Sequence, residues 1–159
     1  MTFADATQRF SNRVADYARY RSSYPSGVVQ LLREECGWIV VAWNDRCINE
    51  TPFAREYEAL LKRFGTDYQS VNNSYPRPEQ MLAFFGANEF VSHSLPNHQE
   101  FDFEGLSGRF RSSSYAPPPG HPNYAPMMEE LQRIFSAHQK DGVVRMEYRT
   151  RIYTGQLVN

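Results

Sequence analysis

The sequence contains little cysteine and no long apolar run. Its 159 residues include two cysteines, Cys36 and Cys47, and their spacing fits neither a metal-binding nor a redox motif. No segment approaches the roughly 20 apolar residues that a membrane helix needs. The polar segment Met1–Arg9 lacks the apolar centre of a signal peptide. We therefore expect a cytoplasmic, reduced protein with no membrane partner.

The sequence also lacks an excess of charge of one sign. The formal net charge is −1, and the 17 basic residues are scattered along the chain. The longest basic stretch, Arg145–Arg151, alternates basic residues with Met146, Glu147 and Tyr148, which is typical of one solvent-facing side of a strand. A nucleic-acid interface needs concentrated basic charge. The charge pattern therefore disfavours a nucleic-acid partner.

Glycine is missing where a nucleotide-type cofactor requires it. Of the nine glycines, only Gly105 and Gly108 lie close together, and their context predicts a helix. A nucleotide site at a strand-to-helix turn needs glycine there, because a side chain would block the close approach of the backbone. The sequence contains no such turn.

Catalytic and metal-binding patterns are absent as well. No serine is marked as lying on a nucleophile turn, so neither a Ser-His-Asp nor a Cys-His arrangement can be assigned. No metal-ligand spacing occurs among the four histidines, and structural roles are expected for them; they are His93, His98, His121 and His138.

What the chain does contain is the material of one folded domain. Apolar residues make up 41% and charged residues 22% of the chain, which is typical of a globular protein. Aromatic residues reach 14% and supply much of the expected core. The length is sufficient for one domain of ordinary size.

Apolar periodicity and capping residues predict several helices. The best marked one has Thr51 as N-cap and Pro52 in the first turn, and ends at Gly65. Asp102 is expected to cap another helix, and the last helix is expected to end at Gly142. The expected helices cover residues 10–18, 26–37, 52–65, 79–85, 103–110 and 127–142.

Three strands are expected. Residues 38–43 form an apolar run without alternation, which is typical of a parallel-sheet strand buried on both faces. Residues 89–95 form a second strand that Pro96 ends. Residues 144–152 alternate apolar and polar side chains, which predicts a half-buried antiparallel strand. A long, partly extended loop is expected over Ser112–Pro126 and is of the kind that often binds ligands.

The most distinctive local feature is the segment Tyr17–Pro25, which combines three tyrosines with two arginines. Tyrosine and arginine side chains can stack on an adenine ring or hold a carboxylate by two hydrogen bonds. The same tyrosines can also belong to a helix end that packs on the core. The residues alone leave both interpretations open.

Two segments together resemble one family. Arg9–Pro25 is similar to the N-terminus of bacterial class I S-adenosylmethionine-dependent methyltransferases of the type 11 group, except that Ser22 replaces a proline of the typical Tyr-Arg-Pro-x-Tyr-Pro. Gly37–Phe53 is similar to the fifth strand of that family and the helix after it. The resemblance continues through residues 101–106, 112–117 and 120–123 to the last strand.

The resemblance implies a partial class I methyltransferase (Rossmann-like) α/β fold. Residues 1–37 would be the N-terminal helical segment, and residues 38–159 would be the C-terminal half, with the last three strands in a small mixed sheet. The first four strands of the family, with the glycine loop that holds the cofactor, are missing. Gly37 then marks an internal deletion, because it serves both as the glycine after the N-terminal helix and as the glycine before the fifth strand.

The resemblance also implies a reaction, which is methyl transfer from S-adenosylmethionine to a small-molecule acceptor. The implied cofactor-binding residues line or cover the donor pocket, and they are Tyr17, Tyr20, Arg21 and Tyr24. The implied substrate-binding residues border the acceptor side, and they are Ser113, Ser114 and Tyr115.

The missing glycine loop predicts that this chain does not hold S-adenosylmethionine and is inactive. The alternative is a non-catalytic remnant or a small α/β interaction module. In the family the fifth strand lies between the fourth and the seventh, so the deletion removes one neighbour of the 38–43 strand. This edge favours a homo-oligomer or a rearranged small sheet covered by the N-terminal helices.

Overall fold

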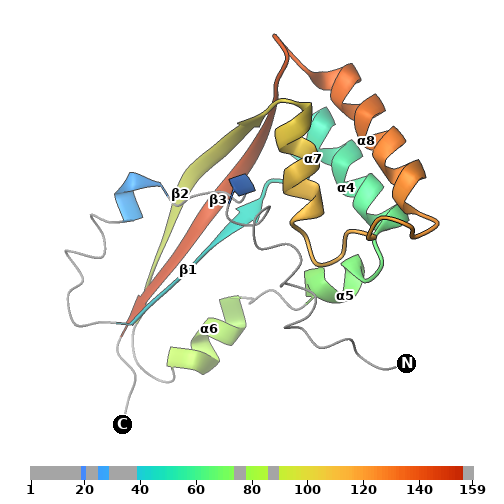
Figure 1. The fold of residues 1–159 in the computed structure, drawn as a ribbon. Coiled ribbons are helices and arrows are strands. Elements are labelled where there is room, and N and C mark those ends of the chain that lie inside the picture. The colour runs from blue at the N-terminus through green and yellow to red at the C-terminus, as the bar shows by residue number, and fades with distance from the viewer. Residues whose placement is uncertain (1–18, 21–24, 29–38, 74–77, 86–89, 156–159) are drawn as a thin grey trace. The chain divides into compact units, whose positions relative to one another are not determined.

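A computed structural model describes residues 19–20, 25–28, 39–73, 78–85 and 90–155 of the chain. The elements in chain order are β1 Ile39–Arg46, α4 Pro52–Phe64, α5 Tyr68–Asn73, α6 Pro78–Phe85, β2 Phe90–Phe101, α7 Phe103–Arg111, α8 Tyr124–His138 and β3 Val144–Gly155 (Figure 1). Of the expected helix 26–37, residues 26–28 are helical, and the remainder lies outside the described residues. The expected helix 10–18 also lies outside them.

The chain divides into two compact units, and each is built from separate stretches of sequence. The first unit takes the described residues of Met1–Arg21, Ile48–Asn73 and Glu100–Met146, and the second takes those of Ser22–Cys47, Ser74–Gln99 and Glu147–Asn159. The boundary expected between residues 37 and 38 lies outside the described residues, so it stays a prediction.

The fold is α/β with a small antiparallel sheet. The strand order is β1-β3-β2, so the last strand lies between the first two. β1 runs antiparallel to β3, with Ile39 opposite Gly155 and Arg46 opposite Tyr148. The expectation of a mixed sheet is therefore wrong for the described strands. In the second unit, Asn44 Oδ1 accepts hydrogen bonds from Thr150 Oγ1 at 2.6 Å and from Asn97 Nδ2 at 3.4 Å, which links all three strands.

β1 differs from the expected parallel strand buried on both faces. Ile39 is 38% exposed, and every other residue of the strand is of intermediate burial. The strand also extends to Arg46. Because β1 lies at one end of the sheet order, its apolar side chains are only partly covered, and an apolar run alone did not distinguish this position from the centre of a sheet.

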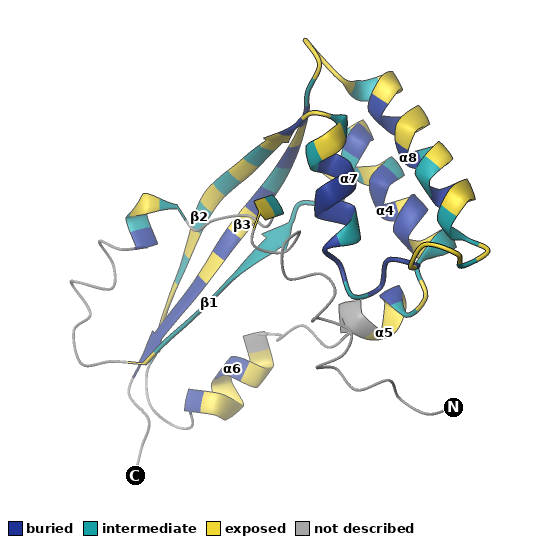
Figure 2. Ribbon diagram, in the orientation of Figure 1, coloured by how far each residue is buried: buried dark blue, intermediate teal, exposed yellow. Residues whose placement is uncertain are grey.

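β3 confirms the expected alternation. Val144, Met146, Tyr148 and Ile152 are buried, while Arg145, Arg149 and Arg151 are exposed, as the alternating colours of this strand in Figure 2 show. As far as Ile152, one side of the strand is therefore buried and the other is exposed, as in a half-buried antiparallel strand. Beyond it Tyr153, on the second side, is buried as well.

β2 continues through Pro96 to Phe101 instead of ending there. Proline has no backbone N–H to donate, so it normally interrupts a strand in the middle of a sheet. β2 is an end strand in the order β1-β3-β2, where one side of the strand makes no ladder hydrogen bonds. The expected break is therefore wrong, because proline is tolerated in an edge strand.

α4 begins and ends as expected. The Thr51 hydroxyl accepts a hydrogen bond of 3.0 Å from the Ala54 N–H, and Pro52 occupies the first turn. Gly65 ends the helix, and its N–H donates to the Leu61 carbonyl. Asp102 likewise caps α7, because its carboxylate accepts from the Gly105 N–H at 2.7 Å.

Two expectations around α8 need correction. The helix ends at His138, and Gly142 instead lies in a turn with a φ of 83°, beside Asp141 with a φ of 51°. The loop expected over Ser112–Pro126 is present as far as Asn123, because α8 begins at Tyr124, and it contains hydrogen-bonded turns in place of extended chain, for example from the Ala116 N–H to the Ser113 carbonyl at 3.1 Å. Prolines and serines in sequence are compatible with tight turns as well as with extended chain.

Each unit has its own core. In the first unit α4 and α7 both pack against α8, and fully buried Leu61, Leu106 and Leu131 lie on these three helices. In the second unit the core consists of Met81, Phe85 and Tyr153, with Val41, Trp43 and Phe90 packed against it. None of the described helices is long and apolar enough to cross a membrane.

Candidate functional site

Of the residues implied to bind the cofactor, the structure describes Tyr20. Tyr17, Arg21 and Tyr24, as well as the proposed junction at Gly37, lie outside the described residues. Tyr20 belongs to the first unit and lies against α7 there. Its hydroxyl donates to Glu104 Oε1 at 3.4 Å, and a Cβ atom added at Gly108 would overlap its ring.

Arg19 contributes to the same contact. Its guanidinium lies 5.2 Å from the centre of the Tyr20 ring and 3.8 Å from Glu104 Oε1. Tyr20 is therefore held on α7 by the ring contact with Gly108 and by an exposed polar pair. This arrangement agrees with the interpretation in which the tyrosine packs against the protein, because one side of the ring is taken up by α7.

The residues implied to border the acceptor follow directly after α7. Ser113 is fully buried, its N–H donates to the Phe110 carbonyl, and its hydroxyl accepts from the Arg109 guanidinium at 3.1 Å. Ser114 is of intermediate burial. Tyr115 is 7% exposed, and its carbonyl accepts from the Thr66 N–H at 3.0 Å. These side chains are mostly turned into the first unit.

Helix α7 connects the two implied groups of residues. Tyr20 contacts it at Gly108, and the neighbouring residue Arg109 bonds to Ser113. Arg109 is itself 6% exposed. Tyr20 and Ser113 therefore contact consecutive residues of α7, Gly108 and Arg109, within one unit. Arg109 and Ser113 are buried and bonded to each other, so these polar groups hold the turn after α7 and do not face a ligand from solvent.

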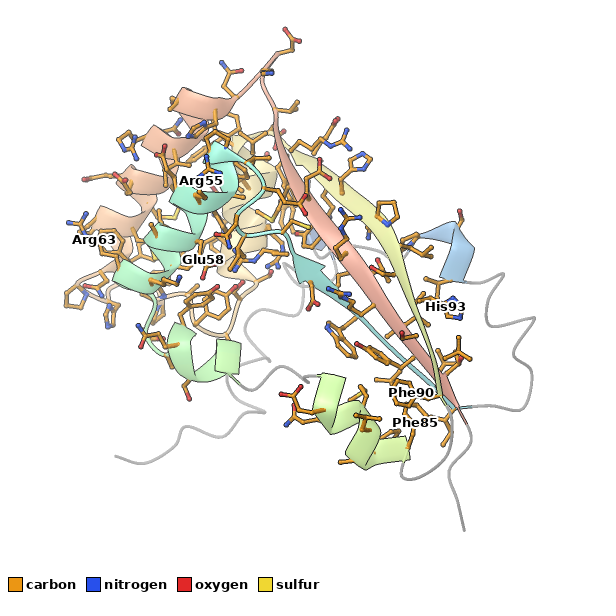
Figure 3. All side chains as sticks on the ribbon, turned by 180° about the vertical axis from the view of Figure 1, so that it is seen from behind. Arg55, Glu58, Arg63, Phe85, Phe90 and His93 are labelled. Atoms are coloured by element: carbon orange, nitrogen blue, oxygen red, sulfur yellow. The ribbon has the colours of Figure 1, made fainter. Side chains whose placement is uncertain are left out.

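Sequence reasoning missed a buried carboxylate next to the acceptor turn. Glu58, which Figure 3 labels on α4, is only 4% exposed. The Tyr68 hydroxyl donates to Glu58 Oε2 at 2.6 Å, and Lys62 Nζ lies 3.4 Å from Glu58 Oε1. The ring of Tyr68 packs edge-on against Tyr115 at 4.8 Å between centroids.

Glycine at position 65 makes this arrangement possible. A Cβ atom there would lie 2.6 Å from the Leu61 carbonyl oxygen and 2.9 Å from the Tyr68 Cβ. Both distances are too short for a side chain, so only glycine lets the chain leave α4 and place Tyr68 over Glu58. The helix-ending glycine was visible in the sequence, whereas its role in placing Tyr68 was not.

A second group of charged residues joins α4 to α8. Arg133 bonds to Glu56 at 2.7 Å and to Glu130 at 2.8 Å, while His138 Nε2 lies 2.9 Å from Glu56 Oε1. The hydrogen bond from Arg133, followed by that from His138, lowers the pKa of Glu56, and the Arg133 bond also lowers the pKa of Glu130. The two carboxylates in turn raise the pKa of the Arg133 guanidinium. The residues are partly exposed, and their geometry is that of a helix–helix ion network.

The histidines do not form a metal centre in the described part of the chain. No group of three or more His, Cys, Asp or Glu side chains there could hold a metal ion. His93 lies on β2 (Figure 3) and His98 is exposed on the same strand. His121 Nδ1 accepts from the Asn123 N–H at 3.1 Å, and His138 bonds to Glu56. The structural roles expected for His121 and His138 agree with these bonds.

The residues present do not fit S-adenosylmethionine at a strand-to-helix turn. In the described residues, β1 leads into α4 through 47–51, and β2 leads into α7 through Asp102. Neither connection contains a glycine, and close backbone approach to a nucleotide requires one. Tyr20 alone does not replace such a turn. The chain matches no family model, and no curated protein or solved structure is similar to it.

Proposed function

We propose that this chain is a class I S-adenosylmethionine-dependent methyltransferase of the type 11 group that retains the N-terminal helical segment and the C-terminal half of the fold but lacks the cofactor-binding middle. The reaction of the family is methyl transfer to a small-molecule acceptor, in which the enzyme mainly aligns the donor methyl with the acceptor. This chain would keep acceptor-side residues such as Ser113, Ser114 and Tyr115. Without the donor half it would not transfer a methyl group by itself.

The observation that carries the proposal is the strand order. In the family the fifth strand is next to the seventh, so the resemblance requires β1 to pair with the last strand instead of with β2. The order β1-β3-β2, with β1 antiparallel to β3, meets this requirement. A simple meander of three strands would place β2 in the middle, which makes the observed crossover informative.

The proposed inactivity rests on the absence of the part of the fold that would bind the cofactor. The sequence has no glycine-rich turn after a strand, and the described connections β1–α4 and β2–α7 contain no glycine. Tyr20, the described member of the implied donor residues, is packed on α7. These features favour a chain whose present role is non-catalytic, either as a remnant or as an interaction module.

Calorimetric titration of the full chain with S-adenosylmethionine tests the cofactor side. We expect no saturable heat, because the turn that would hold the nucleoside is missing. Micromolar binding that is unchanged in the Arg151→Gln variant would overturn the proposed loss of the donor site. The family assignment is tested separately by sequencing the locus and its transcript around codon 37. A methyltransferase core encoded there would support the internal deletion, and an uninterrupted coding sequence without any related segment would contradict it.

The interaction module is favoured by one observation. β1 lies at an end of the strand order, and its first residue, Ile39, is exposed. Association of two copies through the 38–43 strand would extend the sheet, as edge strands commonly do. The homo-oligomer stays a prediction.

A further inference from the structure

A row of aromatic rings crosses one face of the second unit. Phe85 stacks on Phe90 with their centroids 5.2 Å apart, and the two labels lie side by side in Figure 3. Phe90 packs against Tyr153 at 5.8 Å. Tyr153 then stacks on Trp43 at 5.1 Å with only 13° between the ring planes. Among the ring pairs of the described residues, Trp43 contacts Tyr153 alone, so it is the last ring of the row.

Trp43 is held in a fixed orientation. Its Nε1 donates to Asp45 Oδ1 at 2.7 Å, while one side of the indole is stacked on Tyr153. The side chain packs on the core of the second unit but is only partly buried. A ring that is fixed on one side and reached by solvent elsewhere can stack with a planar ligand without losing further rotational freedom.

Two arginines flank this ring and its carboxylate. Arg151 lies directly opposite Trp43 in the β1–β3 register, and Arg149 lies opposite Asp45. Arg151 donates through Nε to Asp45 Oδ2 at 3.3 Å, and its side chain is 45% exposed. That bond leaves the donors of its two terminal amino groups for a further acceptor.

We propose that Trp43, Asp45, Arg149 and Arg151 form a binding site for a planar heteroaromatic anion of the mononucleotide class. The base stacks on the accessible part of the indole, and the anionic group is bound by the terminal amino groups of Arg151. Asp45 is hydrogen-bonded to both Trp43 and Arg151, and Arg149 lies opposite Asp45 on the neighbouring strand. The site uses only residues of the second unit, so it is independent of the proposed methyltransferase origin.

A purely structural role explains this row of aromatic rings less completely than a binding site does. Packing in the core of Met81, Phe85 and Tyr153 accounts for Phe90 and for the packed part of Trp43. It does not require the indole N–H to be bonded to a carboxylate that also binds an exposed arginine. A ring for stacking beside a guanidinium for the anion is the combination that recognises nucleotides.

Tryptophan fluorescence tests the site in the full chain. The sequence has two tryptophans, so the Trp38→Phe variant makes Trp43 the sole emitter. We expect saturable quenching by adenosine monophosphate and none by ribose phosphate, which has no ring. Adenosine, which lacks the anion, should bind about tenfold more weakly, the loss expected when a charged hydrogen bond is absent. Equal affinities for adenosine and its monophosphate, or no saturable quenching, would overturn the proposal.

Further substitutions in the Trp38→Phe variant test which residues bind the ligand. Arg151→Gln should raise the half-saturating concentration about tenfold, and Arg151→Lys should restore part of the affinity because it keeps the charge. Arg145→Gln, on the same strand but in the first unit, is the matched control and should leave binding unchanged. Binding that is unaffected by Arg151→Gln would overturn the site. Quenching of Trp43 by S-adenosylmethionine with the same Arg151 dependence would assign that binding to this surface and not to a methyl-donor site.

Discussion

The hydroxyl of Tyr68 donates a 2.6 Å hydrogen bond to the buried carboxylate of Glu58, ten residues earlier in the chain. The same ring packs edge-on against Tyr115. One side chain therefore joins the middle of α4 to the turn that follows α7. A buried carboxylate is costly unless it is hydrogen-bonded, so Tyr68 both satisfies Glu58 and positions the turn.

Replacing Tyr68 by phenylalanine tests this relationship. The ring contact with Tyr115 is kept, but Glu58 loses a donor, and hydrogen bonds to charged groups contribute about 1.5–3 kcal/mol. We expect the free energy of unfolding in urea to fall by about 2 kcal/mol. Tyr124→Phe is the control, because Tyr124 is only partly buried. Equal losses in the two variants would show that the bond contributes little.

The N-cap of α4 gives a second prediction. Thr51→Ala removes the acceptor for the Ala54 N–H, and the loss of an N-cap costs about 1 kcal/mol. Thr51→Ser keeps the hydroxyl and should stay within about 0.5 kcal/mol of the unchanged chain. Both are measured by urea unfolding. If the serine variant is as unstable as the alanine variant, the cap hydrogen bond is not the cause.

The α4–α8 ion network predicts a dependence of stability on pH. The pKa of Glu56 is lowered from its ordinary value of 4.5, chiefly by the bond from Arg133. The unfolded chain then takes up the proton first, so this stabilisation is present above about pH 4.5 and is lost as the pH falls through the lower folded-state pKa. Arg133→Gln should reduce the melting temperature near neutral pH and have little effect in strong acid.

The control variant for this network is at Arg55, which lies on α4 next to Glu56. Arg55 donates to the Asn49 carbonyl and not to a carboxylate, so Arg55→Gln should lower stability to a similar extent at both pH values. Nuclear magnetic resonance titration of the Glu56 carboxylate supplies an independent measurement. Its pKa should rise toward 4.5 in Arg133→Gln, and an unchanged pKa would contradict the assigned cause.

The placement of Tyr20 on α7 is tested by a double-mutant cycle. Alanine at position 108 would overlap the Tyr20 ring, so Gly108→Ala alone should destabilise the chain. In a Tyr20→Ala background the overlap is removed, and alanine should then be favoured over glycine in the helix by up to about 1 kcal/mol. We therefore expect Gly108→Ala to lower the free energy of unfolding in the unchanged chain and to raise it in the Tyr20→Ala background. The same loss in both would show that Tyr20 does not contact Gly108.

Self-association through β1 can be measured by sedimentation. We expect the weight-average sedimentation coefficient of the full chain to rise with concentration, because an apolar strand at the end of a sheet favours pairing between chains. Ile39→Lys places a charge on this strand at an exposed position and should reduce the association. A monomer over the whole concentration range would contradict edge pairing.

Features set by neighbouring residues could be predicted from the sequence. The cap residues Thr51 and Asp102 act within three residues of their partners, and the alternation of β3 follows from its own side chains. The continuation of β2 through Pro96 could not be predicted, since it depends on the strand's position in the sheet. Local pattern carries no information about that position.

The candidate site was predicted less completely. Ser113 and Tyr115 were named from a resemblance, but their burial depends on Arg109 and Tyr68. The burial of Glu58 could not be predicted, because the helix pattern marks its pairing with Lys62 and not the tyrosine ten residues further on. The one sequence signal for this burial was the position of Glu58 beside Tyr57 and Leu61, which belong to the buried stripe of the helix. Periodicity alone does not show whether a residue at the edge of such a stripe is buried or exposed.

The alternation of the two units along the chain has a consequence for synthesis on the ribosome. The second unit needs residues from Ser22–Cys47, Ser74–Gln99 and Glu147–Asn159, and β3 supplies the strand between its other two. β1 is therefore translated about a hundred residues before its partner, and it must wait in the nascent chain without that partner. Chaperone contact during this interval should concentrate on the apolar strand β1, and ribosome-bound chains that end before β3 should expose it.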